Sequence, residues 1–394
     1  MLRRLFSFFS SLRLTVVLLG LALGLVFIGT LAQVKWGLYI VQSTYFHSLF
    51  VTWTPKGTAW KIPVWPGGWL LGFMLLANLI SAHVKRFSFS KKKIGIFVVH
   101  AGLIFMLVGQ FLTEVFQTES FMAIPQGGSK NYSESGMKSE LAIVDTTDAN
   151  FDNVVAIPEK VLGTRTEIRH EALPFTIRVK SYFQNSVESL ASDKNGKAHF
   201  EFVKADLAVK MNDRNIPATS IELTTSDGTR KELLLSNWTE EEMLLSFLQR
   251  KYRSKFPADL GQPTIFAHQG HTYRLAMRPK RYYKPFTVQL LKFTHERYLG
   301  TDIPKDFSSR VRLVRPETKE DREALIFMNN PLRYWGETYY QGGFAPDDSG
   351  TILQVVRNPS WLTPYISCAI VAGGLLIQFL SHLYTFAKKR TKTA

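Results

Sequence analysis

The chain has 394 residues, a formal net charge of +16 and a single cysteine. This length allows two or three domains, and one cysteine excludes a fold held by internal disulfides. All 32 acidic residues lie between Glu114 and Asp348, and the section 114–357 also holds 33 of the 48 lysines and arginines. That section is therefore nearly neutral, and the remaining 15 basic residues flank apolar segments. The basic excess indicates membrane topology and argues against a nucleic-acid surface.

Four stretches contain no charged residue and are long enough to cross a bilayer, which takes about 20 apolar residues. They are Leu14–Val34, Ile62–Val84, Ile94–Thr113 and Asn358–Ala387. We predict membrane spans at about 14–34, 66–84 and 94–113, and a fourth in 358–394. Pro66 and Pro364 fall near span starts, where the first helical turn needs no backbone donor. A cleaved signal peptide is the alternative for the first span, but its apolar run is too long and lacks a clear cleavage site.

The positive-inside rule then orients the chain. Basic residues gather before the first span, in the second connection and in the tail: Arg3, Arg4, Arg13, Lys85, Arg86, Lys91, Lys92, Lys93, Lys388, Lys389, Arg390 and Lys392. The first connection has only Lys35, Lys56 and Lys61. We expect a multi-pass protein of a bacterial cytoplasmic membrane, with both termini cytoplasmic and the large domain extracytoplasmic.

Residues 1–113 form the membrane region, and its outer loop 35–65 is rich in aromatic residues. Apolar residues at helical spacing in that loop, Leu38 to Leu49, predict a short helix lying in the interface. An ordinary aromatic belt is one interpretation, and a surface for a flat apolar ligand or a partner subunit is the other. The Gly20–Gly24 step and the glycines 95, 102 and 109 predict close helix packing.

Residues 114–357 read mainly as strand and predict a β-sandwich-like domain inserted between spans 3 and 4. The expected strands are Phe175–Phe183, Phe200–Met211, Pro217–Leu223, Phe286–Phe293, Arg310–Val314 and Ala324–Met328. One helix is expected after a capping pattern that begins at Thr239. The stretch Glu188–Ala198 is polar and predicts a loop. The fold class is therefore four transmembrane α-helices with a large mainly-β extracytoplasmic domain.

Motifs for nucleotide binding, for hydrolytic catalysis and for zinc proteases are absent from the sequence. The pair His268 and His271 falls among turn residues, which favours a solvated loop over a metal site. Cys368 lies in the fourth predicted span, where a thiol is most simply a small packing residue. The outer domain contains no cysteine and therefore cannot carry out dithiol chemistry itself.

Three histidines lie in or beside the spans, where ionisable groups are candidates for function. His100 lies six residues into the third span, roughly 9 Å deep at 1.5 Å per residue. His382 lies five residues before Ala387, roughly 7–8 Å deep. His83 lies at the cytoplasmic interface. Two histidines at matching depth could ligate one metal centre, and haem suits an apolar site. The alternatives are a hydrogen bond to another helix for His100 and an ordinary interfacial position for His382 and His83.

Several segments resemble the ResB (CcsB) family, a membrane subunit of the System II pathway of cytochrome c biogenesis. The resemblance rests on segments spread in the right order over nearly the whole chain. They are Leu76–Leu79 with Lys85 and Arg86, Gly95–Leu103, Leu290–Phe293, Tyr298–Thr301, Pro304–Ser309, Asn330–Gln341 and Val355–Pro359.

The resemblance implies a subunit that works with a ResC (CcsA) membrane partner, which carries a tryptophan-rich haem motif that this chain lacks. Together the pair is expected to move haem b, bound non-covalently and in transit, outward for covalent attachment to apocytochrome c. The chain would be one component of such a haem-attaching complex and no stand-alone enzyme. A thioredoxin-like thiol reductant would keep the apocytochrome cysteines reduced. His100 matches the family's haem-ligating transmembrane histidine. His382 and His83 are weaker candidates, proposed from their position alone.

Neutral His100 would serve as an axial iron ligand, which adds no charge to the protein in lipid. Two other hypotheses remain open. One is a scaffold subunit whose outer domain only docks partners and which binds no haem. The other is a membrane-anchored sensor or adhesion module, which the short cytoplasmic segments argue against.

Overall fold

The computed structural model describes residues 2–55, 57–58, 60–85, 93–149, 151–192, 198–208, 214–253, 256–257, 260–301, 303–345 and 347–393. The chain divides into two compact units. We call the described residues up to 118 and from 357 onward the helical unit, and those from 119 to 356 the β unit. Arg86, Lys91, Lys92 and Lys56, which entered the topology prediction, lie outside the described residues.

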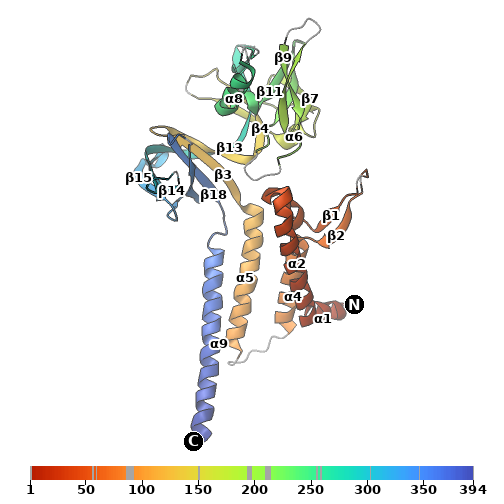
Figure 1. Cartoon of the computed structure of the whole chain (residues 1–394), viewed down its shortest axis with the longest axis vertical. Coiled ribbons are helices and arrows are strands. Elements are labelled where there is room, and N and C mark those ends of the chain that lie inside the picture. Colours follow the sequence, from red (N-terminus) through yellow and green to blue (C-terminus); the bar gives the residue numbers. More distant parts are fainter. Residues whose placement is uncertain are drawn as a thin grey trace. The chain divides into compact units, whose positions relative to one another are not determined.

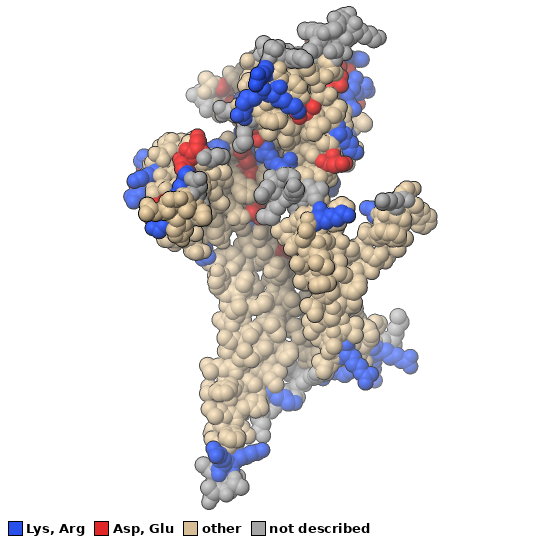
Figure 2. Space-filling model, viewed as in Figure 1, with Lys and Arg blue, Asp and Glu red and all other residues tan. Residues whose placement is uncertain are grey.

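Four helices of the described residues are long and apolar enough to cross a membrane, which confirms four apolar segments and a membrane protein. They are α2 (Leu12–Trp36), α4 (Gly68–Lys85), α5 (Ile94–Phe116) and α9 (Thr363–Thr393). Figure 2 shows their visible surface almost entirely free of charged residues between clusters of lysine and arginine. The remaining elements of the unit are α1 (Leu2–Phe9), α3 (Leu38–Val41), the π-helical turn η1 (Gln42–Phe46), β1 (Phe50–Trp53) and β2 (Ile62–Pro66).

The aromatic loop forms the expected short helix, in α3 and η1, and then a two-stranded hairpin that sequence reasoning did not anticipate. Pro66 is the last residue of β2, and α4 begins two residues later at Gly68. Pro364 is the second residue of α9, as expected for a proline in a first turn.

Helices α5 and α9 run side by side, with their backbones in close contact (Figure 1). Gly95, Gly102 and Gly109 are the buried residues of α5. A methyl group on Gly95 would lie 2.7 Å from the carbonyl oxygen of Gly374, and one on Gly102 would lie 2.7 Å from Val371 Cγ2. The seven-residue glycine stripe is thus the α9-facing side of α5, which confirms the packing prediction. Of the two glycines Gly20 and Gly24 on α2, only Gly24 has an atom within 4 Å of an added methyl group, in the ring of Trp65.

The β unit is built on a ten-stranded sheet, a four-stranded sheet and the pair β8–β9. Its strands are β3 (Thr118–Pro125), β4 (Ser129–Asp145), β5 (Asn153–Pro158), β6 (Glu167–Ile168), β7 (Phe175–Phe183), β8 (Ser186–Ser192), β9 (Ala198–Lys204), β10 (Ala218–Thr225), β11 (Arg230–Ser236), β12 (Thr264–His268), β13 (His271–Arg297), β14 (Pro304–Arg315), β15 (Glu320–Phe327), β16 (Leu332–Tyr334), β17 (Glu337–Phe344) and β18 (Gly350–Arg357). Its short helices are α6 (Glu159–Leu162), α7 (Asn237–Glu240), α8 (Glu242–Tyr252) and η3 (Pro316–Thr318).

The unit has two main hydrophobic cores, whereas the sequence suggested one sandwich-like core. Leu275 and Met277 of β13 belong to the first core, with residues of β7, β10 and β11. Phe286, Val288 and Leu290 of the same strand belong to the second core, with residues of β14, β17 and β18. The 27-residue strand β13 therefore joins the two cores, and its partner β4 runs beside it.

Two local predictions in the β unit were wrong. The helix expected after Thr239 is present as α8, but Thr239 does not cap it, because α8 begins at Glu242 with Glu241 as its N-cap. Thr239 lies in the separate short helix α7, whose N-cap Ser236 accepts a hydrogen bond from the Trp238 amide. The predicted loop Glu188–Ala198 is strand at both described ends, in β8 up to Ser192 and in β9 from Ala198, while 193–197 lie outside the described residues. Polar composition did not reveal this pairing, because a strand at the surface needs apolar residues on only one face.

Candidate functional site

The structure brings His83 and His100 together at one end of the α4–α5 pair. His83 lies in the last turn of α4, and its ring centroid is 5.8 Å from that of His100 on α5, with 33° between the ring planes. Phe97 packs against His83 at 4.6 Å between centroids. Both imidazoles are half-buried. The sequence had placed His83 at the helix end but could not pair it with His100.

The tautomer of His100 follows from its hydrogen bond. Nδ1 lies 2.8 Å from the carbonyl oxygen of Ile96, one helical turn earlier. A carbonyl oxygen can only accept, so Nδ1 carries the proton and donates it. In the neutral ring, the lone pair is then on Nε2, the nitrogen that commonly binds metals. The hydrogen bond to Ile96 therefore orients the His100 ring and leaves Nε2 as its second ring nitrogen, with no hydrogen-bond partner among the described residues.

His382 does not join this pair. Its Nε2 lies 2.7 Å from the amide nitrogen of Gln378, one turn earlier on α9. Gly95 lies against Gly374 and Gln378 of α9, and Gly102 lies against the earlier residues Ser367 to Val371. The two helices are therefore antiparallel. On this alignment, His100 lies at the level of the α9 residues near 371. His382 is then about ten residues further along, roughly 15 Å from the level of His100. Figure 1 shows α9 continuing past the first residue of α5.

Two imidazoles fit the axial needs of a porphyrin iron, which takes one or two protein ligands. Among the described residues, no cluster of three or more His, Cys, Asp or Glu side chains has the geometry to hold a metal ion. The His83–His100 pair is therefore described by its ring contact and by the hydrogen bond of His100.

A second feature of the same helix pair is an apolar cavity of about 330 Å³ at its opposite end. Its walls include Trp69, Phe73 and Phe111, whose rings pack against one another at 5.3–5.7 Å between centroids. His47 and Glu114 line its polar side, with Nε2 and Oε1 2.8 Å apart. Sequence reasoning gave His47 no role. Glu114 could have been identified from the sequence as a candidate, because it is the only acidic residue in 1–118 and 357–394.

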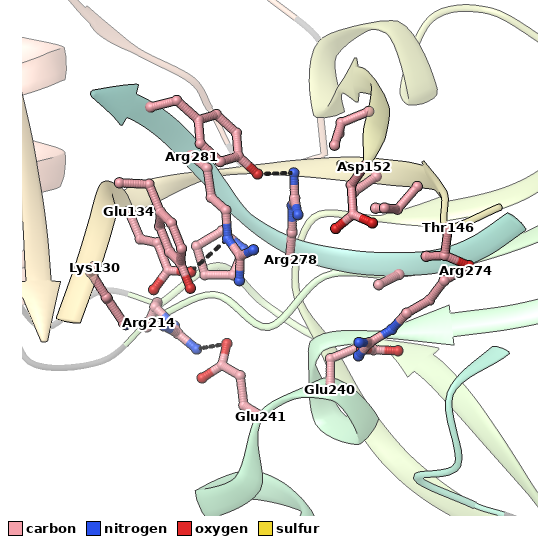
Figure 3. A pocket seen from close by; sticks show the side chains of 17 residues that line it. Lys130, Glu134, Thr146, Asp152, Arg214, Glu240, Glu241, Arg274, Arg278 and Arg281 are labelled. Atoms are coloured by element: carbon pink, nitrogen blue, oxygen red, sulfur yellow. Dashed lines mark hydrogen bonds and ion pairs between the residues drawn. The ribbon is translucent and has the colours of Figure 1, made fainter. Parts of the chain in front are cut away.

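The β unit has a larger, charged cavity of about 450 Å³ between β4, β13 and neighbouring loops (Figure 3). Arg278 and Arg281 enter it from β13, and each meets a carboxylate: Glu140 at 3.1 Å and Glu134 at 3.0 Å. Glu240, also in the wall, has a raised pKa because burial disfavours its charge, although nearby Arg274 opposes the shift. The sequence did not reveal this cavity.

The second half of the β unit resembles known proteins. Residues 251–358 match the family model described as "ResB-like family". Protein NrfI of Wolinella succinogenes is 37% identical to this chain over 106 residues, which is 27% of this chain. The aligned part amounts to 12% of that protein's own length. His83, His100 and His382 all lie outside 251–358, so the family match does not bear on their roles.

Proposed function

We propose that this membrane protein, whose residues 251–358 belong to the ResB-like family, acts in cytochrome c biogenesis and holds haem for attachment to apocytochrome c. The family match and the four apolar helices support a membrane role in that process. The single observation that carries the haem-binding part is the His83–His100 pair, with Nε2 of His100 left as the acceptor nitrogen.

In this proposal His100 supplies an axial ligand and His83 is the nearest candidate for a second one. The Ile96 carbonyl holds the Nδ1 proton and so keeps the His100 ring in one orientation. Phe97 packs against the His83 ring at 4.6 Å between centroids and so supports the position of that side chain. Haem brings the iron and the vinyl groups that form the thioether bonds, and the chain contributes binding and orientation.

We further propose that both termini and the His83–His100 pair lie toward the cytoplasm, from the distribution of lysine and arginine. The aromatic cavity with Trp69 and Phe111 then lies toward the other side of the membrane. It offers an apolar surface for a flat ligand or a partner helix, as the aromatic loop suggested. The partners in this scheme are a ResC (CcsA) subunit, apocytochrome c and a thioredoxin-like reductant. Because Cys368 is the only cysteine, reducing equivalents must come from such a partner.

Replacement of the ligand tests the proposal. His100→Gly should lower the haem that co-purifies with the chain, and added imidazole should restore it, because the small ligand can enter the space that the side chain leaves. His382→Gly is the matched control: it also removes a hydrogen-bonded histidine from the helical unit, but one distant from the pair. Haem content that is unaffected by His100→Gly would remove His100 from the mechanism.

A scaffold subunit that binds no haem is the second candidate, and one observation favours it. Apart from its last two residues, the family match lies in the β unit, so the part of the chain that carries the resemblance is the part that could dock partners. This alternative predicts that His100→Gly and the wild type assemble equally with the membrane partner and carry equal, negligible haem. The same purification therefore distinguishes the two functions.

A further inference from the structure

The charged cavity of the β unit has an architecture that the proposed function does not explain. Strands β4 and β13 pair Pro279 with Ser139 and Arg281 with Glu134, so the register shifts between these pairs. Proline has no N–H to donate to the ladder, and such irregularities re-aim side chains. The shift directs Arg278 and Arg281 into the cavity, where Figure 3 shows both among the lining side chains.

The arginines retain hydrogen-bonding capacity beyond their ion pairs. A guanidinium has five N–H donors, and the hydrogen-bond partners of Arg281 are Glu134, which accepts from Nε at 3.0 Å, and Tyr283. Arg278, whose side chain is 10% exposed, contacts Glu140 through Nε and Nη2 and donates from Nη2 to the Tyr283 hydroxyl at 3.4 Å. The carboxylates of these pairs are therefore neutralised, while N–H groups remain for an incoming acceptor.

Lys130 adds positive charge at the same place. It alternates with Tyr132 and Glu134 along β4, so the three side chains lie on one face of the strand. Its ammonium group lies 5.2 Å from the Tyr132 ring centroid. Among the described residues, no carboxylate lies within 4 Å of it. Five basic residues line the cavity (Lys130, Arg214, Arg274, Arg278 and Arg281) against four acidic ones (Glu134, Asp152, Glu240 and Glu241). The walls therefore carry one net positive charge, and Lys130 is the cation among them that favours an anionic group.

The same end has flat surfaces. The guanidinium of Arg281 stacks over the Tyr132 ring at 4.1 Å, and the rings of Tyr132 and Tyr283 lie 5.7 Å apart. Tyr283 is 51% exposed, so part of this surface is open to a ligand. Arginine recognises planar carboxylates through parallel N–H donors, and tyrosine packs against aromatic rings. A cavity of about 450 Å³ is within the range of small-molecule sites.

We propose that this cavity binds the carboxylates of a flat, apolar ring, through Arg281 and Lys130, with Tyr132 and Tyr283 against the ring edge. Given the proposed function, on which this inference rests, the ligand class is a porphyrin with its propionates. The site would be a second holding point for haem, on the β unit, that recognises the propionate edge and leaves the iron and the vinyl groups free.

Iron-free protoporphyrin IX is the probe, because without iron it does not depend on His100 as a ligand. Its fluorescence is titrated with the full chain in detergent and compared with that of its dimethyl ester, which has the same ring but no carboxylate. The wild type should bind the free acid about tenfold or more tightly than the ester, the factor expected for a charge-assisted hydrogen bond. Arg281→Gln and Lys130→Gln should each reduce that preference.

Arg322→Gln is the matched control. Arg322 also lies over a tyrosine ring, Tyr334, at 5.3 Å and pairs with Glu320 at 2.8 Å, but it is outside the cavity. Its replacement should leave the preference intact. If Arg281→Gln unfolds the β unit by leaving Glu134 unpaired, Arg281→Gln with Glu134→Gln removes both charges, and Lys130→Gln leaves the ion pair unchanged.

Equal binding of acid and ester by the wild type, or a preference unchanged in both Lys130→Gln and the Arg281 variants, would overturn the inference. A preference for the acid that inorganic phosphate abolishes at equal concentration would also overturn it, since the site would then recognise any anion. These results are independent of the haem content of His100→Gly, so the inference and the proposed function can fail separately.

Discussion

Gly373 and Gly374 are neighbours on α9 in opposite surroundings, and this contrast gives a quantitative test of the helix packing. A methyl group on Gly374 would lie 2.8 Å from the Val99 backbone nitrogen and 2.9 Å from the Gly95 carbonyl oxygen. A methyl group on Gly373 would have no atom within 4 Å. Because the close atoms are backbone atoms, no side-chain rotation can relieve the contact, and the helices must move apart.

The difference in the free energy of unfolding between Gly373→Ala and Gly374→Ala measures the effect of helix packing alone. Gly→Ala favours the helix by up to about 1 kcal/mol at either position, so this contribution cancels in the difference between the variants. Overpacking costs about 1–3 kcal/mol. Gly374→Ala should therefore unfold with a free energy about 1–3 kcal/mol lower than that of Gly373→Ala. Denaturant titration in detergent, followed by far-UV circular dichroism, measures both. Equal stabilities would contradict the close approach of α5 and α9.

Two further predictions concern the β unit. Lys284 and Glu337 form an ion pair with side chains 3% and 9% exposed, and the Tyr339 hydroxyl donates to Glu337 at 2.7 Å. Lys284→Met should destabilise the protein by about 3–5 kcal/mol because it leaves a buried carboxylate unpaired, and Lys284→Met with Glu337→Gln should recover much of that loss in thermal melts. Hydrogen bonds from Thr225 and then from Thr229 lower the pKa of Asp227 from 3.8 to about 2. A carboxyl group whose pKa is lower in the folded than in the unfolded chain stabilises the fold at every pH above its unfolded pKa. For Asp227 this stabilisation is lost as the pH falls from about 4 to about 2. Asp227→Asn should remove this part of the acid sensitivity, and melting temperatures that fall equally in both proteins over that range would contradict it.

The sequence was a good guide to features that local pattern determines. Strand β7 has the bounds predicted from its branched and aromatic residues, and each predicted span corresponds to a helix. The glycines at 95, 102 and 109 indicated the contact face of α5, because spacing alone places them on one side of a helix.

The site was less predictable, because it depends on register between elements. His83 and His100 meet only when α4 and α5 are aligned, and nothing local in either segment specifies that alignment. The depth argument that matched His382 with His100 assumed that the fourth span ends at Ala387. Helix α9 instead continues to Thr393, and the α9 residues level with His100 are those near 371. The cavity of the β unit depends on a register shift in a 27-residue strand, of which the sequence suggested only Phe286–Phe293.

In the proposed function, the His83–His100 pair of this chain holds haem iron. The absorption spectrum of the chain, purified alone and together with the proposed ResC (CcsA) partner, measures this ligation. If the pair ligates the iron, the spectrum is low-spin with two nitrogen ligands, and it is lost in His100→Gly, restored by imidazole and retained in His382→Gly. A chain that carries no haem under either condition, or a spectrum that is unchanged in His100→Gly, would contradict it.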